Sequence, residues 1–305
     1  MRAALLSGGT GGAKLARGLL DVVGADALTV IANTGDDTEA HGAHVSPDPD
    51  LVTYWLADAI DERGYGIAGD TWEVMGALEA AGRPVWFRLG DRDLAMCLIR
   101  TQLIAEGATP TAAHAAVVEA MGVRARVLPM ADTPVRTRVT VAGRARGFQE
   151  FMIVGRARGP LDAVELEGID EARPTDAVLR GLAAADAIVI GPSNPVVSIG
   201  PILAVPGMRQ AIAEASAPVV AVSPFVGGEV LKGPTRLFCE HAGIESSAAG
   251  LLDTYTGVLD GMVSDEPVRG IAALEIDTLM DTAERRRHVA EKTLEFAASL
   301  PGADD

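Results

Sequence analysis

RAALLSGGTGGAKLARGLLDV, residues 2–22, contains a short apolar strand, a glycine-rich turn and the start of a helix in immediate succession. A strand that turns into a helix in this way directs backbone N–H groups toward the helix N-terminus, where phosphate oxygens bind. The alternative is a tight turn that needs glycine only for positive φ angles. We predict a nucleotide phosphate-binding loop, and its residues are Gly9, Thr10, Gly11, Gly12 and Lys14.

This loop does not match two common nucleotide-binding patterns. In a Walker A loop, glycine precedes the lysine and a hydroxyl residue follows it, whereas Lys14 stands between alanine and leucine. The dinucleotide fingerprint fits Gly9 and Gly11, but Lys14 occupies the place of its third glycine. The second strand ends in Asn33 rather than in a ribose-binding acid. An ATPase and an NAD-dependent oxidoreductase are therefore both disfavoured.

Composition narrows the class of protein further. The chain has 305 residues, a net charge of −16, 48% hydrophobic residues and only 4% aromatic residues. An aliphatic core of this kind is typical of α/β proteins. The acidic balance argues against binding to nucleic acid or to an anionic membrane, since both need a basic surface. An anionic small molecule must then be held locally, by loops, helix dipoles, a metal ion or a few arginines.

The expected location is the cytoplasm. Cys97 and Cys239 are the two cysteines, and their number and spacing fit neither a disulfide framework nor a zinc site. The N-terminus leads directly into the first strand, with no pattern of a targeting segment, and no apolar run approaches ~18 residues.

Apolar periodicity predicts a Rossmann-like α/β fold with a mostly parallel sheet. Strands are expected at residues 2–6, 28–32, 187–190 and 219–222, each followed by a loop and a helix. The tail, residues 282–300, has the pattern of a charged amphipathic helix.

Two regions interrupt this alternation. Helical spacing prevails from residue 51 to about 122, with one short strand expected at 84–89. Two β-rich runs between residues 135 and 154 flank a turn at Ala142 and predict an antiparallel hairpin. We therefore expect residues 1–50 and 130–305 to form the nucleotide-binding core and residues 51–129 to form a mainly helical insertion across a cleft.

Two further loops follow predicted strands and are expected at the same sheet edge, where ligands bind in open α/β sheets. In residues 191–195, two prolines flank Ser193 and Asn194, whose polar side chains suit a phosphate, a ribose or a base edge. The alternative is a rigid turn before a helix. The other loop, residues 223–228, leads to Lys232.

The loop at residues 34–50 is acidic, and carboxylates beside a phosphate repel it unless a cation lies between them. Asp36 follows the second strand, and Asp50 precedes a predicted helix. Hard oxygen ligands of this kind suit Mg²⁺. The alternative for Asp50 is a helix N-cap. His41 and His44 lack a third soft ligand nearby, which argues against zinc.

A motif of two bases and two acids, RLGDRD at residues 88–93, stands before another predicted helix. Arg88 or Arg92 is suited to hold an anionic group in the cleft, whereas Asp91 or Asp93 is suited to cap the helix. The chain offers no nucleophile elbow and no Cys/His pair, so covalent catalysis has no evident agent.

Taken together, these motifs resemble those of the 2-phospho-L-lactate transferase family of coenzyme F-420 biosynthesis. The resemblance extends over nearly the whole chain. The segments that carry it are SGGTGGAK (7–14), NTGDD (33–37), VSPDPD (45–50), RLGDRD (88–93), FQEF (148–151) and GPSNPVVSIGP (191–201).

The resemblance implies a reaction. A guanosine-diphosphate-activated three-carbon phosphoacid is the donor, and the terminal ribityl hydroxyl of the deazaflavin Fo attacks its distal phosphorus and releases GMP. The resemblance also implies which residues bind each ligand. The nucleotide is held by Gly9, Thr10, Gly11, Gly12, Lys14, Ser193 and Asn194. By the same resemblance, Asp36 and Asp50 hold Mg²⁺, and Asp50 and Arg88 border the deazaflavin. Lys14 and Asp50 are the expected catalytic residues. Arginine at position 88 replaces the lysine often found there.

The resemblance leaves some alternatives open. A sister family of non-catalytic nucleotide-sugar-binding regulators shares the glycine loop and the core fold, but it is not expected to carry the segments 46–50 and 89–93. The donor is a phospholactyl, phosphoenolpyruvyl or phosphoglyceryl compound, and these groups differ too little for the sequence to distinguish them. A homodimer is expected, with the apolar run at 148–154 and the amphipathic tail as candidate contact surfaces.

Overall fold

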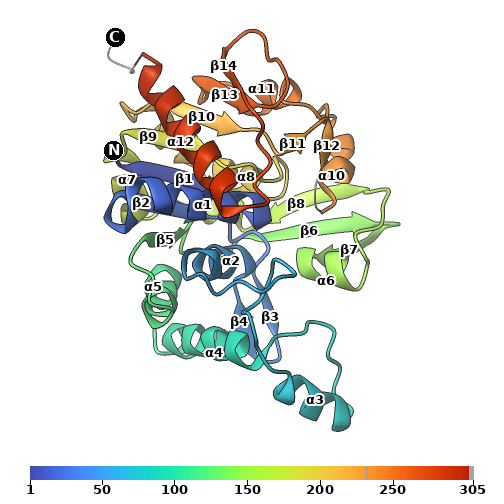
Figure 1. The fold of residues 1–305 in the computed structure, drawn as a ribbon. Coiled ribbons are helices and arrows are strands. Elements are labelled where there is room, and N and C mark those ends of the chain that lie inside the picture. The colour runs from blue at the N-terminus through green and yellow to red at the C-terminus, as the bar shows by residue number, and fades with distance from the viewer. Residues whose placement is uncertain (231–232, 302–305) are drawn as a thin grey trace.

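A seven-stranded parallel sheet forms the centre of the computed structural model, which describes residues 1–230 and 233–301 (Figure 1). The strand order is β14-β13-β10-β9-β1-β2-β5, so β1 lies inside the sheet and pairs with β2 on one side and β9 on the other. The strands are β1 (Ala3–Ser7), β2 (Leu28–Ala32), β5 (Arg126–Pro129), β9 (Ala187–Ile190), β10 (Val219–Val222), β13 (Gly261–Ser264) and β14 (Ala272–Glu275). The prediction of a Rossmann-like, mostly parallel sheet is confirmed.

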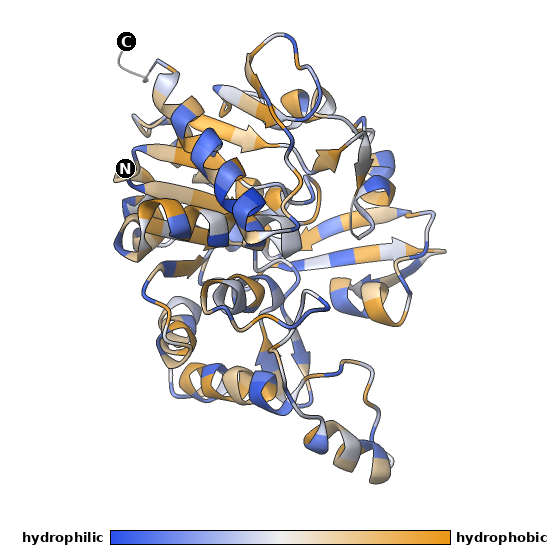
Figure 2. Ribbon diagram, in the orientation of Figure 1, coloured by the Kyte–Doolittle hydropathy of each residue, from blue (hydrophilic) through white to orange (hydrophobic). Residues whose placement is uncertain are grey.

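Both faces of this sheet are covered, which explains why its strands read as continuous apolar runs. Leu5 points into a cluster with Ala13 and Leu19, whereas Leu6 on the other face packs with Ile188 and Ile202. The apolar strands lie between helices in Figure 2. The helices on the Leu5 face are α1 (Gly9–Val23), α2 (Pro47–Leu56) and α12 (Ala283–Ser299). The helices on the Leu6 face are α7 (Asp176–Ala183), α8 (Ile199–Ala204), α9 (Met208–Ala213), α10 (Thr235–Ala242) and α11 (Gly250–Thr254).

Below the sheet in Figure 1, the chain forms a helical region with a small core of its own. Its elements are α3 (Glu73–Ala80), α4 (Asp91–Ala105), α5 (Pro110–Ala120) and the hairpin of β3 (Thr38–Ala40) and β4 (Ala43–Val45). The hairpin lies within the segment that the sequence predicted to be an unstructured acidic loop. The strand expected at residues 84–89 is absent from the described residues, and His41 Nε2 hydrogen-bonds the carbonyl of Phe87 at 2.6 Å.

A separate antiparallel sheet of β6 (Arg136–Val141), β7 (Arg144–Gly147) and β8 (Ala163–Glu167) confirms the predicted hairpin but shortens it. The run at 148–154 was expected to continue the hairpin, and that expectation is wrong. These residues form α6 (Phe148–Ile153), which buries Phe151 with its ring centroid 5.9 Å from that of Phe238 and leaves Ile153 exposed. An amphipathic turn of helix satisfies this apolar spacing without a partner strand.

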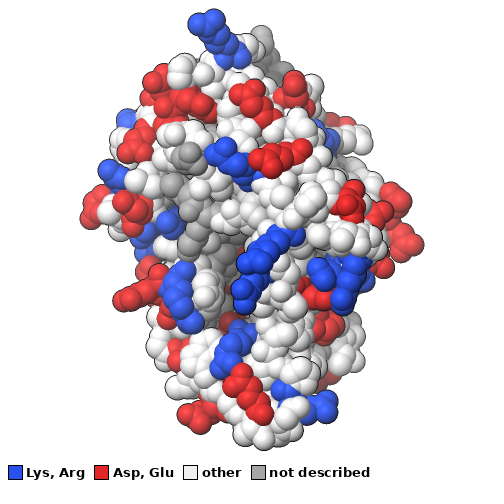
Figure 3. Space-filling view, turned by 90° about the vertical axis from the view of Figure 1, so that its right-hand side faces the viewer, with Lys and Arg blue, Asp and Glu red and all other residues white. Residues whose placement is uncertain are grey.

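The remaining elements are short. They are the two-stranded pair β11 (Phe225–Val226) and β12 (Glu229–Val230) and the 3-10 helices Ala25–Ala27 and Ile169–Glu171. None of the helices that the structure describes is long and apolar enough to span a lipid bilayer. Figure 3 shows the side that carries β6 to β8, where Lys and Arg side chains gather across the middle of the face between more acidic regions.

Candidate functional site

The carboxyl ends of β1, β2 and β9 meet at one edge of the sheet, where the chain order reverses around β1. Such a reversal point is where open α/β sheets bind ligands, because the loops diverge there and leave a crevice. Two backbone hydrogen bonds tie the loops together: Asn33 N–H donates to Ser7 O at 3.0 Å, and Gly191 N–H donates to Leu6 O at 2.9 Å. Three predicted loops therefore converge on this edge.

The glycine-rich segment forms the first turn of α1 rather than a turn that precedes it. Gly8 is the N-cap, and Gly9 takes a φ of +63°, which favours glycine. Gly11 and Gly12 are needed for a different reason, which is close approach to other loops. A Cβ on Gly11 would lie 2.0 Å from Pro192 O, and one on Gly12 would lie 2.4 Å from Ser7 Oγ. The loop after β9 thus packs directly on the helix N-terminus.

A side-chain carboxylate already contacts this N-terminus. Asp48, in the first turn of α2, accepts a hydrogen bond from Gly9 N–H at 2.6 Å. On the other side, Gly8 N–H donates to Ser193 Oγ at 3.2 Å. The positive end of the α1 dipole favours negative charge at this place, and the Asp48 carboxylate lies there.

Asn33 organises the acidic residues behind the loop. Its Nδ2 donates to Asp36 Oδ1 at 3.1 Å and to Asp48 Oδ2 at 2.9 Å, and its Oδ1 accepts from Gly35 N–H at 2.8 Å. The same Nδ2 lies 3.3 Å from Val197 O. An amide at the end of β2 therefore joins two carboxylates, where an NAD-binding site would need an acid. These hydrogen bonds of Asn33 explain why the chain departs from the dinucleotide-binding fingerprint at this position.

The two carboxylates are buried and close to other negative charges. Burial, together with the charges of Asp48 and Asp37, raises the pKa of Asp36 well above its usual range. Burial also raises the pKa of Asp48, to about 6, although the hydrogen bonds from Asn33 and Gly9 lower it. Gln149 Nε2 donates to Asp36 Oδ2 at 3.2 Å. A cluster in which carboxylate charge is disfavoured in this way would be stabilised by a cation.

Asp50 faces a different partner. It lies inside the first turn of α2 rather than at its N-cap, and one carboxylate oxygen, Oδ1, contacts Arg100 Nη2 of α4. Its other oxygen, Oδ2, is buried and has no hydrogen-bond partner. Burial raises the pKa of Asp50, and the charge of Arg100 lowers it. The structure thus links Asp36 to Asp48 through Asn33, and it links Asp50 to Arg100.

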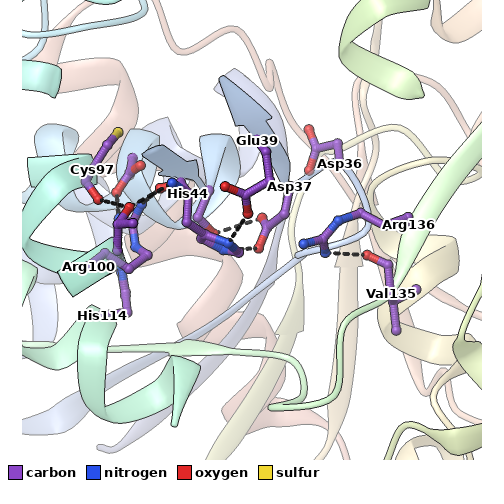
Figure 4. Close-up of polar contacts among 12 residues, drawn as sticks. Asp36, Asp37, Glu39, His44, Cys97, Arg100, His114, Val135 and Arg136 are labelled. Carbon is purple, nitrogen blue, oxygen red and sulfur yellow. Dashed lines mark hydrogen bonds and ion pairs between the residues drawn. The ribbon is translucent and has the colours of Figure 1, made fainter. Parts of the chain in front are cut away.

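His44 connects this region to Asp37 (Figure 4). Its Nε2 lies 3.2 Å from Asp37 Oδ2 and its Nδ1 lies 3.0 Å from Glu39 Oε1. Burial by itself lowers the pKa of His44, but the hydrogen bond and charge of Asp37 raise it above its usual value. Ser46 Oγ donates to Asp37 Oδ1 at 2.7 Å. These contacts pair both ring nitrogens of His44 with carboxylates.

The other predicted nucleotide-binding residues have distinct environments. Asn194 Oδ1 accepts from Val196 N–H at 2.9 Å and from Val197 N–H at 3.2 Å, so this side chain shapes its own loop. Thr10 and Lys14 lie half-buried on the first turns of α1. The loop at 223–228 is described, whereas Lys232 lies outside the described residues.

The RLGDRD motif lies on the helical region. Arg88 contacts Glu79 and places its guanidinium 5.6 Å from the centre of the Trp72 ring. The expectation that Asp91 or Asp93 caps the following helix is wrong. Asp70 accepts hydrogen bonds from Arg92 N–H at 2.8 Å and Asp93 N–H at 3.0 Å and thereby caps α4.

The two acids of the motif serve other elements. Asp91 accepts from Glu73 N–H and Val74 N–H, both at 3.0 Å, at the start of α3. Asp93 accepts from Tyr54 Oη of α2 at 2.7 Å. The motif therefore joins α2, α3 and α4.

Asp93→Asn is expected to raise stability at pH 8 and to have little effect at pH 4. Burial and the charge of Asp50 raise the pKa of Asp93 to about 6, compared with about 3.9 in an unfolded chain. A raised carboxyl pKa contributes stability at low pH that is lost as the pH rises through about 4 to 6. The amide removes this loss and keeps an acceptor for Tyr54. Thermal denaturation at both pH values should show a gain of up to about 3 kcal/mol at pH 8 only. An equal change at both pH values would show that the ionisation of Asp93 is not the cause.

Two residues of the site were missed by sequence reasoning, Arg100 and His114. Both are almost fully buried and lie in the helices α4 and α5. They line a small cavity of about 30 Å³, together with Thr34, His44 and Arg136. The only sign of the site in this part of the sequence was Arg100, an arginine within the apolar pattern of a predicted helix. That pattern does not indicate which carboxylate the arginine contacts.

The chain alone does not complete a metal centre. Among residues 1–230 and 233–301, no group of three or more His, Cys, Asp or Glu side chains is arranged to hold a metal ion by itself. Mg²⁺ commonly binds one or two carboxylates and takes its other ligands from water and substrate phosphates. The unpartnered Oδ2 of Asp50 and the crowded carboxylates of Asp36, Asp37 and Asp48 are compatible with that kind of site.

Comparisons with known proteins agree with this architecture. The family model described as 2-phospho-L-lactate transferase CofD matches residues 4–293. The phosphoenolpyruvate transferase of Kitasatospora aureofaciens is 39% identical, over 98% of this chain and 99% of that protein. The 2-phospho-L-lactate transferase of Methanosarcina mazei is 37% identical, over 94% of this chain and 97% of that protein.

A solved structure shares the fold. A Bacillus halodurans protein described as a member of the upf0052 family superposes with a TM-score of 0.61 at 18% identity, and the match covers 96% of this chain and 98% of that chain. At this identity the likeness concerns the fold alone.

Proposed function

The chain belongs to the 2-phospho-L-lactate transferase family and is a transferase of coenzyme F-420 biosynthesis, and from this premise we propose the reaction that its site performs. The donor is a three-carbon phosphoacid activated by guanosine diphosphate. The acceptor is the terminal ribityl hydroxyl of the deazaflavin Fo. The products are a phosphodiester and GMP. The observation that carries this proposal is the convergence of an anion-binding helix N-terminus and a buried, half-paired carboxylate, Asp50, at one sheet edge.

The nucleotide part of the donor is assigned to the loops after β1 and β9. Gly9, Thr10, Gly11 and Gly12 form the start of α1, where the Gly9 N–H already donates to Asp48, and Lys14 adds a positive charge one turn later. Ser193 and Asn194 border the same turn, because Ser193 Oγ accepts from Gly8 N–H. This assignment places the diphosphate where the helix dipole stabilises it.

The acceptor is assigned to the side of Asp50 and Arg88. Arg88 is half-exposed, pairs with Glu79 and lies over the Trp72 ring, so this part of the helical region presents a planar guanidinium and an indole suited to stack on a heterocycle. Asp50 Oδ2 is the free carboxylate oxygen that accepts the proton of the attacking hydroxyl or orients that hydroxyl.

We propose that Asp36 and Asp50 contribute carboxylates to a Mg²⁺ site that substrate phosphates complete, with Asp48 close to Asp36. When bound, the ion would neutralise charge on the phosphates. This arrangement accounts for a glycine loop that has no hydroxyl residue after Lys14, because the ion is held by other loops.

Catalysis in this proposal rests on positioning and charge. The chain holds the hydroxyl in line with the phosphorus–oxygen bond that breaks, and the departing GMP phosphate stays on the α1 amides and Lys14. Asp50 takes the hydroxyl proton as the new phosphorus–oxygen bond forms. No covalent enzyme intermediate is needed, in keeping with the lack of an evident nucleophile in the sequence.

The test is product analysis by mass spectrometry. We expect the protein with Mg²⁺, Fo and an equimolar mixture of phospholactyl, phosphoenolpyruvyl and phosphoglyceryl guanosine diphosphates to release GMP and form an Fo phosphodiester. The mass of that product identifies the preferred donor. Omitting Fo controls for hydrolysis. A protein that binds the nucleotides but releases no GMP in the presence of Fo would refute the proposal.

A further inference from the structure

We infer that Arg100 and His114 are positioning residues, which hold Asp50 so that its free oxygen Oδ2 is presented to the acceptor hydroxyl. This inference rests on the proposed function of Asp50. Neither residue belongs to the glycine loop, the acidic loop or the RLGDRD motif. They come from α4 and α5, which lie beside α2 in Figure 1.

Arg100 is fixed at two points. Its Nη2 contacts Asp50 Oδ1, and its Nη1 donates to His44 O of β4 at 3.1 Å. The residue is 1% exposed, so water does not compete for the guanidinium. Since a planar guanidinium bound at both ends cannot rotate freely, its contact with Oδ1 fixes the plane of the Asp50 carboxylate.

His114 contacts the same Arg100 nitrogen as Asp50, Nη2, and hydrogen-bond partners define its ring orientation. Thr53 Oγ1 donates to Pro49 O at 2.8 Å, so this hydroxyl is an acceptor toward His114 Nε2, which lies 3.3 Å away. The proton then resides on Nε2, and Nδ1 is left to accept from Arg100 Nη2 at 3.4 Å. Burial and the charge of Arg100 lower the pKa of His114 well below its usual value, in line with a neutral ring.

The result is a chain of contacts that ends on a single carboxylate oxygen. Thr53, His114 and Arg100 hold Oδ1, and Oδ2 of the same carboxylate is buried without a partner. A buried ion pair that served stability alone would be expected to satisfy both oxygens, because an unpaired buried acceptor costs free energy. On this inference, the unpartnered oxygen is the one that receives the substrate hydroxyl.

The test compares His114→Phe, which keeps a planar ring but removes the acceptor, with His114→Asn, whose amide oxygen can take the place of Nδ1. We expect His114→Phe to lower kcat about tenfold and to raise the KM for Fo about threefold, and His114→Asn to recover most of both losses. Val117→Ala on the same helix is the matched control, since it removes buried volume from α5 and changes no hydrogen-bonding side chain. It should lower the melting temperature and leave kcat unchanged.

A double-mutant cycle on deazaflavin binding separates this inference from the proposed function. Fluorescence titration should show about threefold weaker binding of Fo to His114→Phe, and no further weakening when the same change is made in Asp50→Asn. Additive effects, or a loss in His114→Asn equal to that in His114→Phe, would overturn the inference. If the wild type binds Fo but forms no product, the proposed reaction fails and the binding cycle still decides the role of His114.

Discussion

Asp50→Asn is expected to lower kcat about 100-fold with Mg²⁺ saturating. Asparagine keeps the shape of the side chain and an oxygen that can accept from Arg100, so the contact seen at Oδ1 can persist. The other position becomes an amide NH₂ group, which neither accepts a proton from the attacking hydroxyl nor binds a cation. Initial-rate measurement of GMP release gives kcat, and full turnover in this variant would show that Asp50 has no role in the chemistry.

The same substitution also leaves Arg100 as a buried charge without a counter-ion, and this costs about 3 kcal/mol of stability. A loss of activity must therefore be separated from a loss of fold. The double variant Asp50→Asn with Arg100→Gln removes both charges, and we expect it to regain most of the stability but none of the activity. Recovery of turnover together with the melting temperature would instead assign Asp50 a purely structural role.

The core of the fold was predictable because its strands are buried on both faces. β1, β2, β9 and β10 are short continuous apolar runs, and each was predicted from that feature. β5, which starts with an exposed arginine, carries a weaker signal and was not predicted. The run at 148–154 shows the limit of periodicity, because a seven-residue segment with apolar side chains at 148 and 151–154 can form either a strand or a helix.

The site could be predicted from sequence only where its residues follow strands. Loops after parallel strands necessarily meet at one edge, so the glycine loop, the acidic loop and Ser193 were placed together correctly by topology. No such topological rule predicts the contact between Asp50 and Arg100. It joins α2 to α4 across 50 residues of chain, and it depends on how two helices pack. The role of Asn33 as a donor to both Asp36 and Asp48 likewise depends on the three-dimensional course of the loop.

Gly11→Ala is expected to cost about 3 kcal/mol of stability and to weaken nucleotide binding at least about tenfold. Alanine within a helix ordinarily stabilises a protein by about 1 kcal/mol relative to glycine. In α1, however, the added methyl group would lie 2.0 Å from Pro192 O, a backbone atom that cannot turn aside. The first turn of α1 and the loop after β9 must then separate, and these are the two segments proposed to hold the donor.

Gly76→Ala provides the matched control for this effect. Gly76 lies within α3, and a Cβ there meets no heavy atom within 4 Å, so helix propensity alone acts and stability should rise by about 1 kcal/mol. Chemical denaturation of both variants and calorimetric titration with GDP measure the two predicted effects. Because the substitutions are chemically identical, opposite signs can come only from the contact with Pro192. A Gly11→Ala protein that is as stable as Gly76→Ala and binds GDP normally would show that the two loops need not approach so closely.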